Sequence, residues 1–167
     1  RGSYTYTTAE ESRTLTGAFF ADLSGLTPGT TYYYRAKAYG DGAPVYGGEE
    51  TFTTSTTPPS VTTNDAGNVG TTSATLNGDL TSLGTDGSVM VSFEWGTAPG
   101  SYTYATADQE TTLTGDFSAD LSGLTPGTTY FYRAKADGDG NPVYGLEKTF
   151  TTLTIPPSVR TDDASNV

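Results

Sequence analysis

The residues with the clearest potential for chemistry are the aspartates of a glycine-rich segment, DGDGN at residues 137–141. Asp137 and Asp139 supply the oxygen ligands that Ca²⁺ prefers, but the segment lacks the terminal bidentate glutamate of an EF-hand loop. A second copy of the segment, at residues 39–43, retains one of the two aspartates. A cation needed by every copy would require both, so the pattern favours a tight turn over a metal site.

Two further acidic positions follow proline pairs. Asp65 comes after Asn64, and Asp163 comes after Asp162. Carboxylates at such junctions are able to bind Ca²⁺ between successive units and stiffen the chain. Ca²⁺ is therefore the cofactor that the sequence leaves open, and no other cofactor is expected.

A carboxylate beside an aromatic ring is the other arrangement with catalytic potential, because glycoside hydrolysis uses paired carboxylates. Glu94 precedes Trp95, but the alternation of polarity directs Glu94 away from the core. A cross-strand ion pair with Arg133 or Lys135 is the favoured role. The absence of Cys and His excludes cysteine nucleophiles and Ser-His-Asp triads. We therefore predict no catalytic residue and no enzyme activity.

Tyrosines form a further group of candidates. Tyr102, Tyr104 and Tyr144, together with Phe131, are expected at the surface. Exposed aromatic rings bind sugars or pack against neighbouring repeats, but Tyr and Phe are also enriched in strands for ordinary packing reasons. The sequence favours packing, within or between subunits, and leaves a polysaccharide partner open.

The elements that position these residues are strands. In VMVSFEW, at residues 89–95, apolar and polar residues alternate with period two, and residues 130–136 show the same alternation. Shorter segments of this kind lie at residues 74–80, 117–121 and 149–152, separated by glycine-rich turns. We predict about seven short strands and no helix, which together form an all-β, two-sheet sandwich.

An internal repeat defines the domain organisation. LSGLTPGTTY at residues 23–32 recurs at residues 121–130, and the offset of 121 − 23 = 98 residues holds without insertion or deletion. About three-quarters of the overlapping positions are identical. Proline pairs at 58–59 and 156–157 mark the junctions. The predicted units are residues 1–57, the C-terminal part of a repeat, residues 58–155, a complete repeat, and residues 156–167, the first strand of the next repeat.

The first predicted unit lacks the positions equivalent to residues 73–80 and 88–95. Its inward-facing residues, such as Phe19 and Leu23, would then be exposed. We expect the chain to be a segment of a longer polypeptide that supplies the missing strands. Completion by strands of another chain is the alternative.

The segment LTPGTTY, which occurs twice and ends at Tyr32 and at Tyr130, resembles the tyrosine-corner segment of fibronectin type III domains. The resemblance implies tandem seven-stranded, Ig-like sandwiches, in which these two hydroxyls bond to nearby backbone. The family usually carries a Trp on the second strand, where this chain has Gly78. We expect Trp95, on the next strand, to fill the vacated core space.

FEWGT at residues 93–97, followed by Tyr102, resembles repeats of large bacterial and archaeal surface proteins. This resemblance implies an extracellular parent, secreted or at the cell surface. The formal net charge of −11 disfavours nucleic acid as a partner. No segment reaches the roughly 18–20 apolar residues of a membrane span.

Several functions remain open at this point. The preferred hypothesis is a structural repeat of an extracellular filament, stalk or fibre, with copies of itself or adjacent repeats as partners. One alternative is an adhesive or carbohydrate-binding module that gains avidity from repetition. The other is a spacer module of a secreted glycan-degrading enzyme.

Overall fold

The computed structural model describes residues 4–138 and 141–161, and every regular element in them is a β-strand. The prediction of an all-β chain is confirmed. Internal contacts divide the chain into two compact units, residues 1–56 and residues 57–167, with the boundary beside the first proline pair. Within the described residues, no helix has the length and apolar character needed to cross a membrane.

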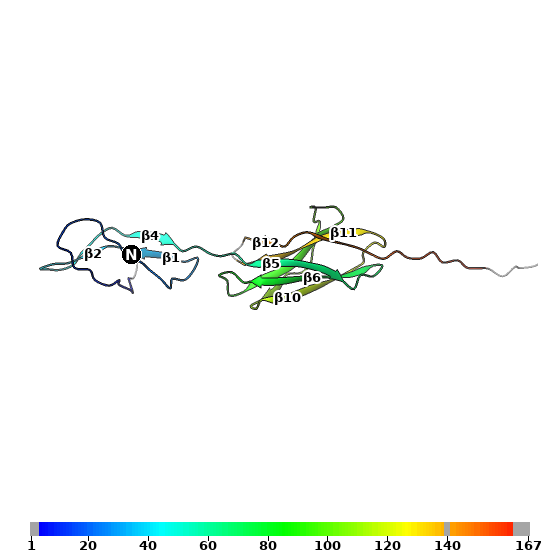
Figure 1. The fold of residues 1–167 in the computed structure, drawn as a ribbon, viewed down its shortest axis with the longest axis horizontal. Coiled ribbons are helices and arrows are strands. Elements are labelled where there is room, and N and C mark those ends of the chain that lie inside the picture. The colour runs from blue at the N-terminus through cyan, green and yellow to red at the C-terminus, as the bar shows by residue number, and fades with distance from the viewer. Residues whose placement is uncertain (1–3, 139–140, 162–167) are drawn as a thin grey trace, which may run out of the picture. The chain divides into compact units, whose positions relative to one another are not determined.

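The first sheet of the second unit consists of β5 (Ser60–Gly67), β6 (Ser73–Ser82) and β10 (Gly115–Ser122). The strands are antiparallel in the order β10-β6-β5 (Figure 1). Side chains of β6 alternate between buried and partly exposed positions, so Ala74, Leu76 and Leu80 lie on the inner face as predicted.

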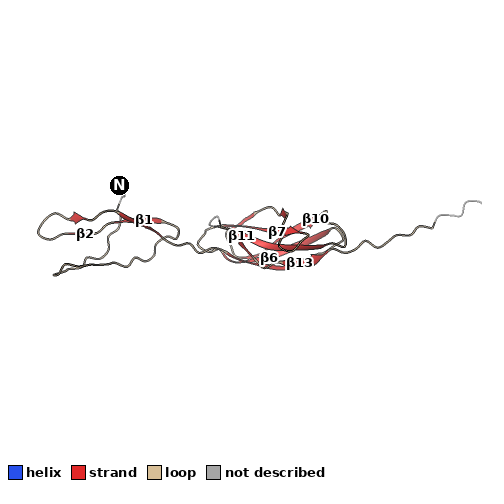
Figure 2. Cartoon of the chain, turned by 90° about the horizontal axis from the view of Figure 1, so that it is seen from above, coloured by secondary structure: helices blue, strands red, loops and turns tan. Residues whose placement is uncertain are grey.

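The second sheet has β11 at its centre. β11 pairs with β7 on one side and with β12 and β13 on the other, and β8 and β9 pair with the free side of β7. Figure 2 shows β7, β11 and β13 of this sheet. Val91, Phe93, Tyr132 and Ala134 are buried and face the first sheet. The strand bounds are β7 (Val89–Gly96), β8 (Tyr104–Ala105), β9 (Gln109–Thr111), β11 (Thr129–Asp137), β12 (Val143–Tyr144) and β13 (Lys148–Thr151).

Hydrogen bonds between β5 and β11 connect the two sheets. The Tyr132 hydroxyl donates to the Asn64 carbonyl oxygen at 2.7 Å, and the Ala134 N–H donates to Thr63 Oγ1 at 2.9 Å. Burial raises the pKa of Tyr132 to about 12, because the ionised phenolate would lose its hydration there. The chain has no Cys, so these bonds and the apolar core hold the sheets together without a disulfide.

Phe117, and not Trp95, covers the backbone at Gly78. A Cβ atom at Gly78 would lie 2.7 Å from Phe117 Cζ, so the ring occupies the place of a side chain. Phe117 lies directly opposite Gly78 in the β6–β10 pair, and its ring also contacts Phe93, with 5.0 Å between centroids. The expectation that Trp95 fills this space is therefore wrong. Trp95 is partly buried and packs edge-on against the Tyr130 ring instead.

The first unit contains β1 (Thr31–Tyr34), β2 (Lys37–Ala38), β3 (Val45–Tyr46) and β4 (Glu50–Thr53). They form the antiparallel pairs β1–β4 and β2–β3. These pairs repeat, 98 positions earlier, the pairing of β11 with β13 and with β12. Leu23 is half exposed, whereas its counterpart Leu121 is buried between the sheets of the second unit.

The predicted third unit begins after β13. Residues 156–161 form no strand. The remaining positions, 162–167, lie outside the described residues, so a first strand of a further repeat stays a prediction.

Candidate functional site on the six-stranded sheet

An arginine lies between two tyrosine rings on the outer face of the six-stranded sheet. Arg133 belongs to β11 and faces away from the core side that Tyr132 and Ala134 occupy, because side chains alternate along a strand. Its guanidinium carbon lies 3.6 Å from the centroid of the Tyr144 ring and 4.4 Å from that of the Tyr102 ring. A cation over the face of an aromatic ring is attracted by the ring quadrupole, so the three side chains stabilise one another.

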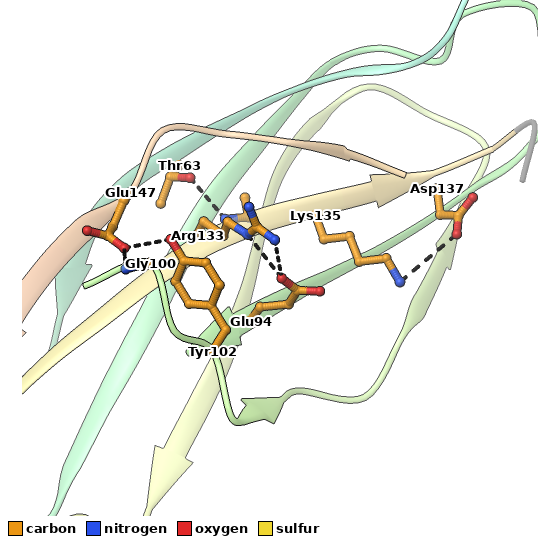
Figure 3. Close-up of polar contacts among 9 residues, drawn as sticks. Thr63, Glu94, Gly100, Tyr102, Arg133, Lys135, Asp137 and Glu147 are labelled. Atoms are coloured by element: carbon orange, nitrogen blue, oxygen red, sulfur yellow. Dashed lines mark hydrogen bonds and ion pairs between the residues drawn. The ribbon is translucent and has the colours of Figure 1, made fainter. Parts of the chain in front are cut away.

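Arg133 also pairs with a carboxylate of the neighbouring strand. Glu94 lies opposite Arg133 in the β7–β11 register, and Glu94 Oε2 accepts hydrogen bonds from Arg133 Nε at 3.0 Å and Nη2 at 2.7 Å (Figure 3). The predicted cross-strand ion pair is therefore confirmed for Arg133. Lys135 instead lies beside Asp137, with 4.0 Å between Nζ and Oδ2. The side chains of Arg133 and Glu94 are 28% and 23% exposed, so solvent partly screens this pair.

Glu147 joins two loops beside this cluster. Its Oε2 atom accepts hydrogen bonds from the Tyr102 hydroxyl at 2.6 Å and from the Gly100 N–H at 2.7 Å (Figure 3). Burial, together with the bond to Glu147, raises the pKa of Tyr102 to about 12. The bond from Tyr102, and then that from Gly100, lowers the pKa of Glu147. Glu147 is therefore a carboxylate at neutral pH.

The same cluster recurs in the first unit. Arg35 lies 3.8 Å from the centroid of the Tyr46 ring and 4.2 Å from that of the Tyr4 ring, and the Tyr4 hydroxyl donates to Glu49. Each of these residues precedes its counterpart by 98 positions. The arrangement therefore belongs to the repeat. Sequence reasoning missed the role of Glu147, although its recurrence as Glu49 was a usable signal.

The chemistry available to this cluster is structural. Glycoside hydrolysis needs one carboxyl held protonated and a second held ionised. Glu94 is bonded to Arg133, and the lowered pKa of Glu147 opposes its use as a proton donor. Its bonds tie the segment after β7 to the segment between β12 and β13.

The structure brings together two of the three predicted tyrosines. Tyr102 and Tyr144 share Arg133. Tyr104 lies on β8, where its ring stacks on Trp95 with 4.5 Å between centroids. Tyr104 is 55% exposed, and the surface aromatic residues are therefore divided between two places.

The aspartates considered for Ca²⁺ lie beside lysines where the structure describes them. Asp65 Oδ1 is 2.6 Å from Lys148 Nζ, and Asp137 lies beside a lysine of its own strand. Asp139 and Asp163 lie outside the described residues. Among the residues that are described, no group of three or more His, Cys, Asp or Glu side chains is placed to hold a metal ion. A calcium site at these positions stays the open alternative to the predicted tight turn and junction surface.

The two predicted corner tyrosines make the same contact in both units. The Tyr130 hydroxyl accepts a hydrogen bond from the Thr125 N–H at 2.9 Å, and the Tyr32 hydroxyl accepts one from the Thr27 N–H at 2.9 Å. The Tyr130 ring also stacks on Phe150, with 5.4 Å between centroids. The hydroxyl thus bonds to the turn that leads into the strand carrying it.

No family model matches the chain. Endoglucanase B of Cellulomonas fimi is 38% identical over 143 residues, which cover 80% of this chain. The chain spans 13% of the length of that relative.

Solved structures share the architecture at low identity. Domains d3–d4 of the rat CD45 extracellular region match with a TM-score of 0.50 and 18% identity, covering 90% of this chain and 79% of that one. The sensor domain of the anti-sigma factor RsgI4 of Pseudobacteroides cellulosolvens matches with a TM-score of 0.49 and 21% identity, covering 59% of this chain and 97% of that one. Fibronectin type III domains are also among the neighbours. The chain has the fibronectin type III-like β-sandwich fold. In this fibronectin type III-like unit, the arginine–tyrosine cluster lies on the outer face of the larger sheet.

Proposed function

We propose that this chain is a non-catalytic spacer segment of a secreted, multidomain glycan-degrading protein, in which β-sandwich repeats are joined in series. The observation that carries the proposal is the 38% identity to Endoglucanase B over 143 residues. The second unit has 167 − 56 = 111 residues, so a match of that length extends across the junction into the first unit. The region of similarity therefore includes the junction between the two units, which supports a serial arrangement in the parent protein.

The chemistry of the candidate site supports a non-catalytic role. Its carboxylates are bonded to Arg133, to Tyr102 and to a backbone N–H. Such bonds hold loops in place, which is a structural role. Catalysis would then belong to other parts of the parent protein.

The junction between the repeats is bonded to the second unit. The Thr85 N–H donates to the Thr57 carbonyl oxygen at 2.9 Å, and the Thr57 N–H donates to Thr85 Oγ1 at 3.2 Å. Gly84 has a φ of 68°, and a Cβ atom there would overlap the Thr57 carbonyl oxygen and the Pro58 carbonyl group. Pro59 is buried. The loop between β6 and β7 therefore holds the residues that follow the junction.

Few residues separate the hydrogen bond of Thr54 in the first unit from the hydrogen bonds of Thr57 in the second unit. In the first unit, the Thr54 N–H donates to the Thr30 carbonyl oxygen at 3.1 Å. Ser55 and Thr56 are the residues that separate Thr54 from Thr57. Two residues therefore connect the last of these hydrogen bonds in the first unit to the first one in the second unit. Such a junction suits a spacer whose reach depends on the number of repeats.

A structural fibre remains the second candidate. Near-identical units in one register favour it, because identical interfaces along one axis produce a filament when they do not close. A fibre requires association between chains, whereas a spacer functions as a single chain. The two proposals therefore differ in their solution behaviour.

The experiment uses the full chain, placed between a β-1,4-glucanase domain and a cellulose-binding domain. One control joins the two domains directly, and another joins them through a Gly-Ser linker with the same number of residues. We expect equal rates on soluble carboxymethylcellulose and a higher rate on insoluble cellulose with the repeats. Equal rates on insoluble cellulose would overturn the spacer proposal. Concentration-dependent assembly of the chain in sedimentation velocity would favour the fibre.

A further inference from the structure

A stacked aromatic pair lies at the edge of the second sheet. Tyr104 on β8 is opposite Trp95 on β7, and the two rings stack at 4.5 Å with 24° between their planes. Trp95 contacts the Tyr130 ring edge-on at 5.7 Å, so the core fixes its position. One face of the Tyr104 ring is therefore covered by Trp95, while 55% of the residue remains exposed.

The other surface tyrosines of this unit are engaged differently. Tyr102 and Tyr144 both hold Arg133 against a ring face, and the Tyr102 hydroxyl is bonded to Glu147. The Tyr104 hydroxyl makes no hydrogen bond with the part of the chain that the structure describes. Tyr104 thus combines an open ring face, a free hydroxyl and a fixed orientation.

We propose that Tyr104, supported by Trp95, is a binding platform for a neutral glucan chain. A pyranose ring with equatorial hydroxyls has an apolar C–H face, and this face stacks on an aromatic ring, whereas its hydroxyls bond at the rim. The orientation of Tyr104 is already fixed by stacking, so binding a sugar costs little side-chain entropy. The choice of a glucan rests on the proposed function.

The charge of the chain selects among glycans. With a formal net charge of −11, the chain repels uronate-containing and sulfated polysaccharides. A neutral glucan has no charge to be repelled and needs none to bind a tyrosine ring. We therefore expect binding that depends little on salt, because few ion pairs form.

The repeat carries a second tyrosine at the position of Tyr104, whereas the stacked Trp occurs once, because Trp95 is the only Trp in the sequence. Tyr6 is the counterpart of Tyr104, 98 positions earlier, so the repeat carries a tyrosine at this place in both copies. A single stacked sugar binds weakly, with a Kd on the order of 1 mM. Several platforms on one chain raise the apparent affinity for a polymer through effective concentration. A spacer of this kind would also hold its parent on the polysaccharide.

The test is a titration of the full chain with cellohexaose, followed by the fluorescence of Trp95, which is the only Trp in the sequence. We expect a saturable change in emission for the wild type. The variant Tyr104→Ala should bind about tenfold more weakly, because it loses the stacking surface, and Tyr104→Phe should retain most of the binding. Leu146→Ala is the matched control, since Leu146 is an 86% exposed apolar residue of the same unit.

Circular dichroism of each variant checks that the sandwich is intact, and amide chemical shifts around residues 95 and 104 report binding independently of Trp95 emission. Binding that is unchanged in Tyr104→Ala, or absent from the wild type at tens of millimolar cellohexaose, would refute the platform. An equal affinity for polygalacturonate would also refute it. A negative result here would not decide the spacer experiment. In that experiment, the rates of the fusion proteins on insoluble cellulose depend on the length of the connecting segment even if the segment binds no glucan.

Discussion

The hydroxyl of Tyr130 offers a direct test of what stabilises the second unit. Tyr130 is 4% exposed, and its hydroxyl accepts a hydrogen bond from the Thr125 N–H at 2.9 Å. The variant Tyr130→Phe removes this oxygen and keeps the ring, so the contacts with Phe150 and Trp95 persist. The Thr125 N–H then loses its acceptor within the protein, at a hydrogen bond that is partly buried. The change isolates one hydrogen bond at the turn before β11.

The expected loss of stability follows from that unsatisfied donor. Thr125 is itself exposed, so water replaces part of this bond, and the loss is that of a typical intramolecular hydrogen bond, about 0.5–1.5 kcal/mol. The repeat is 155 − 57 = 98 residues long, and each kcal/mol lowers the Tm of a domain of this size by about 4–8 °C. We therefore expect Tyr130→Phe to lower the Tm of the second unit by at least about 2 °C.

The assay is thermal unfolding followed by Trp95 emission, which reports on the second unit because Trp95 contacts Tyr130. The control is Tyr104→Phe, which also removes one phenolic oxygen, but from a residue that is 55% exposed. That control should leave the Tm within about 1 °C of the wild type, as surface substitutions usually do. Equal Tm values for Tyr130→Phe and Tyr104→Phe would show that the corner bond does not stabilise the fold.

Three further results are expected. Gly78→Ala should destabilise the unit by about 1–3 kcal/mol in urea unfolding, because its Cβ would lie 2.7 Å from the Phe117 ring, and adding Phe117→Leu should recover part of the loss. Asp116→Asn should stabilise the unit by about 0.2–1 kcal/mol in urea unfolding at neutral pH, because Asp116 lies directly opposite Asp79, and the gain should shrink at high salt, which screens the repulsion. The pKa of Tyr102 is raised to about 12, so its contribution to stability is complete below the ordinary tyrosine pKa and is lost as the pH rises towards 12. Absorbance at alkaline pH should therefore show one fewer late-titrating tyrosine in Tyr102→Phe than in the wild type.

The strands and their faces were predictable because the signal is local. Alternation over residues 89–95 and 130–136 placed Phe93 and Tyr132 in the core, where both are fully buried. The same alternation placed Glu94 and Arg133 on the outer face, where they pair across the strands. A side chain's face depends only on its position along a strand, so a single sequence is sufficient.

The neighbours across the sandwich were not predictable in this way. The space over Gly78 was assigned to Trp95, but β10 supplies Phe117, which lies 39 positions after Gly78 in the sequence (117 − 78 = 39). Such a contact depends on strand order and register, which periodicity does not define. The two aromatic clusters illustrate the same limit, because Tyr102 and Tyr104 are two residues apart and yet contact Arg133 and Trp95 respectively.

The hydrogen bonds of β5 and of the residue after β13 explain how a repeat without cysteine is closed. Consecutive residues of β5 contact the opposite sheet: Thr63 accepts from the Ala134 N–H, the Asn64 carbonyl accepts from Tyr132, and Asp65 pairs with a lysine of β13. β5 is also the first strand after the junction. At the other end, the Leu153 N–H, just after β13, donates to the Gly70 carbonyl oxygen at 2.9 Å. The repeat is thus hydrogen-bonded both where the chain enters it and where the chain leaves it.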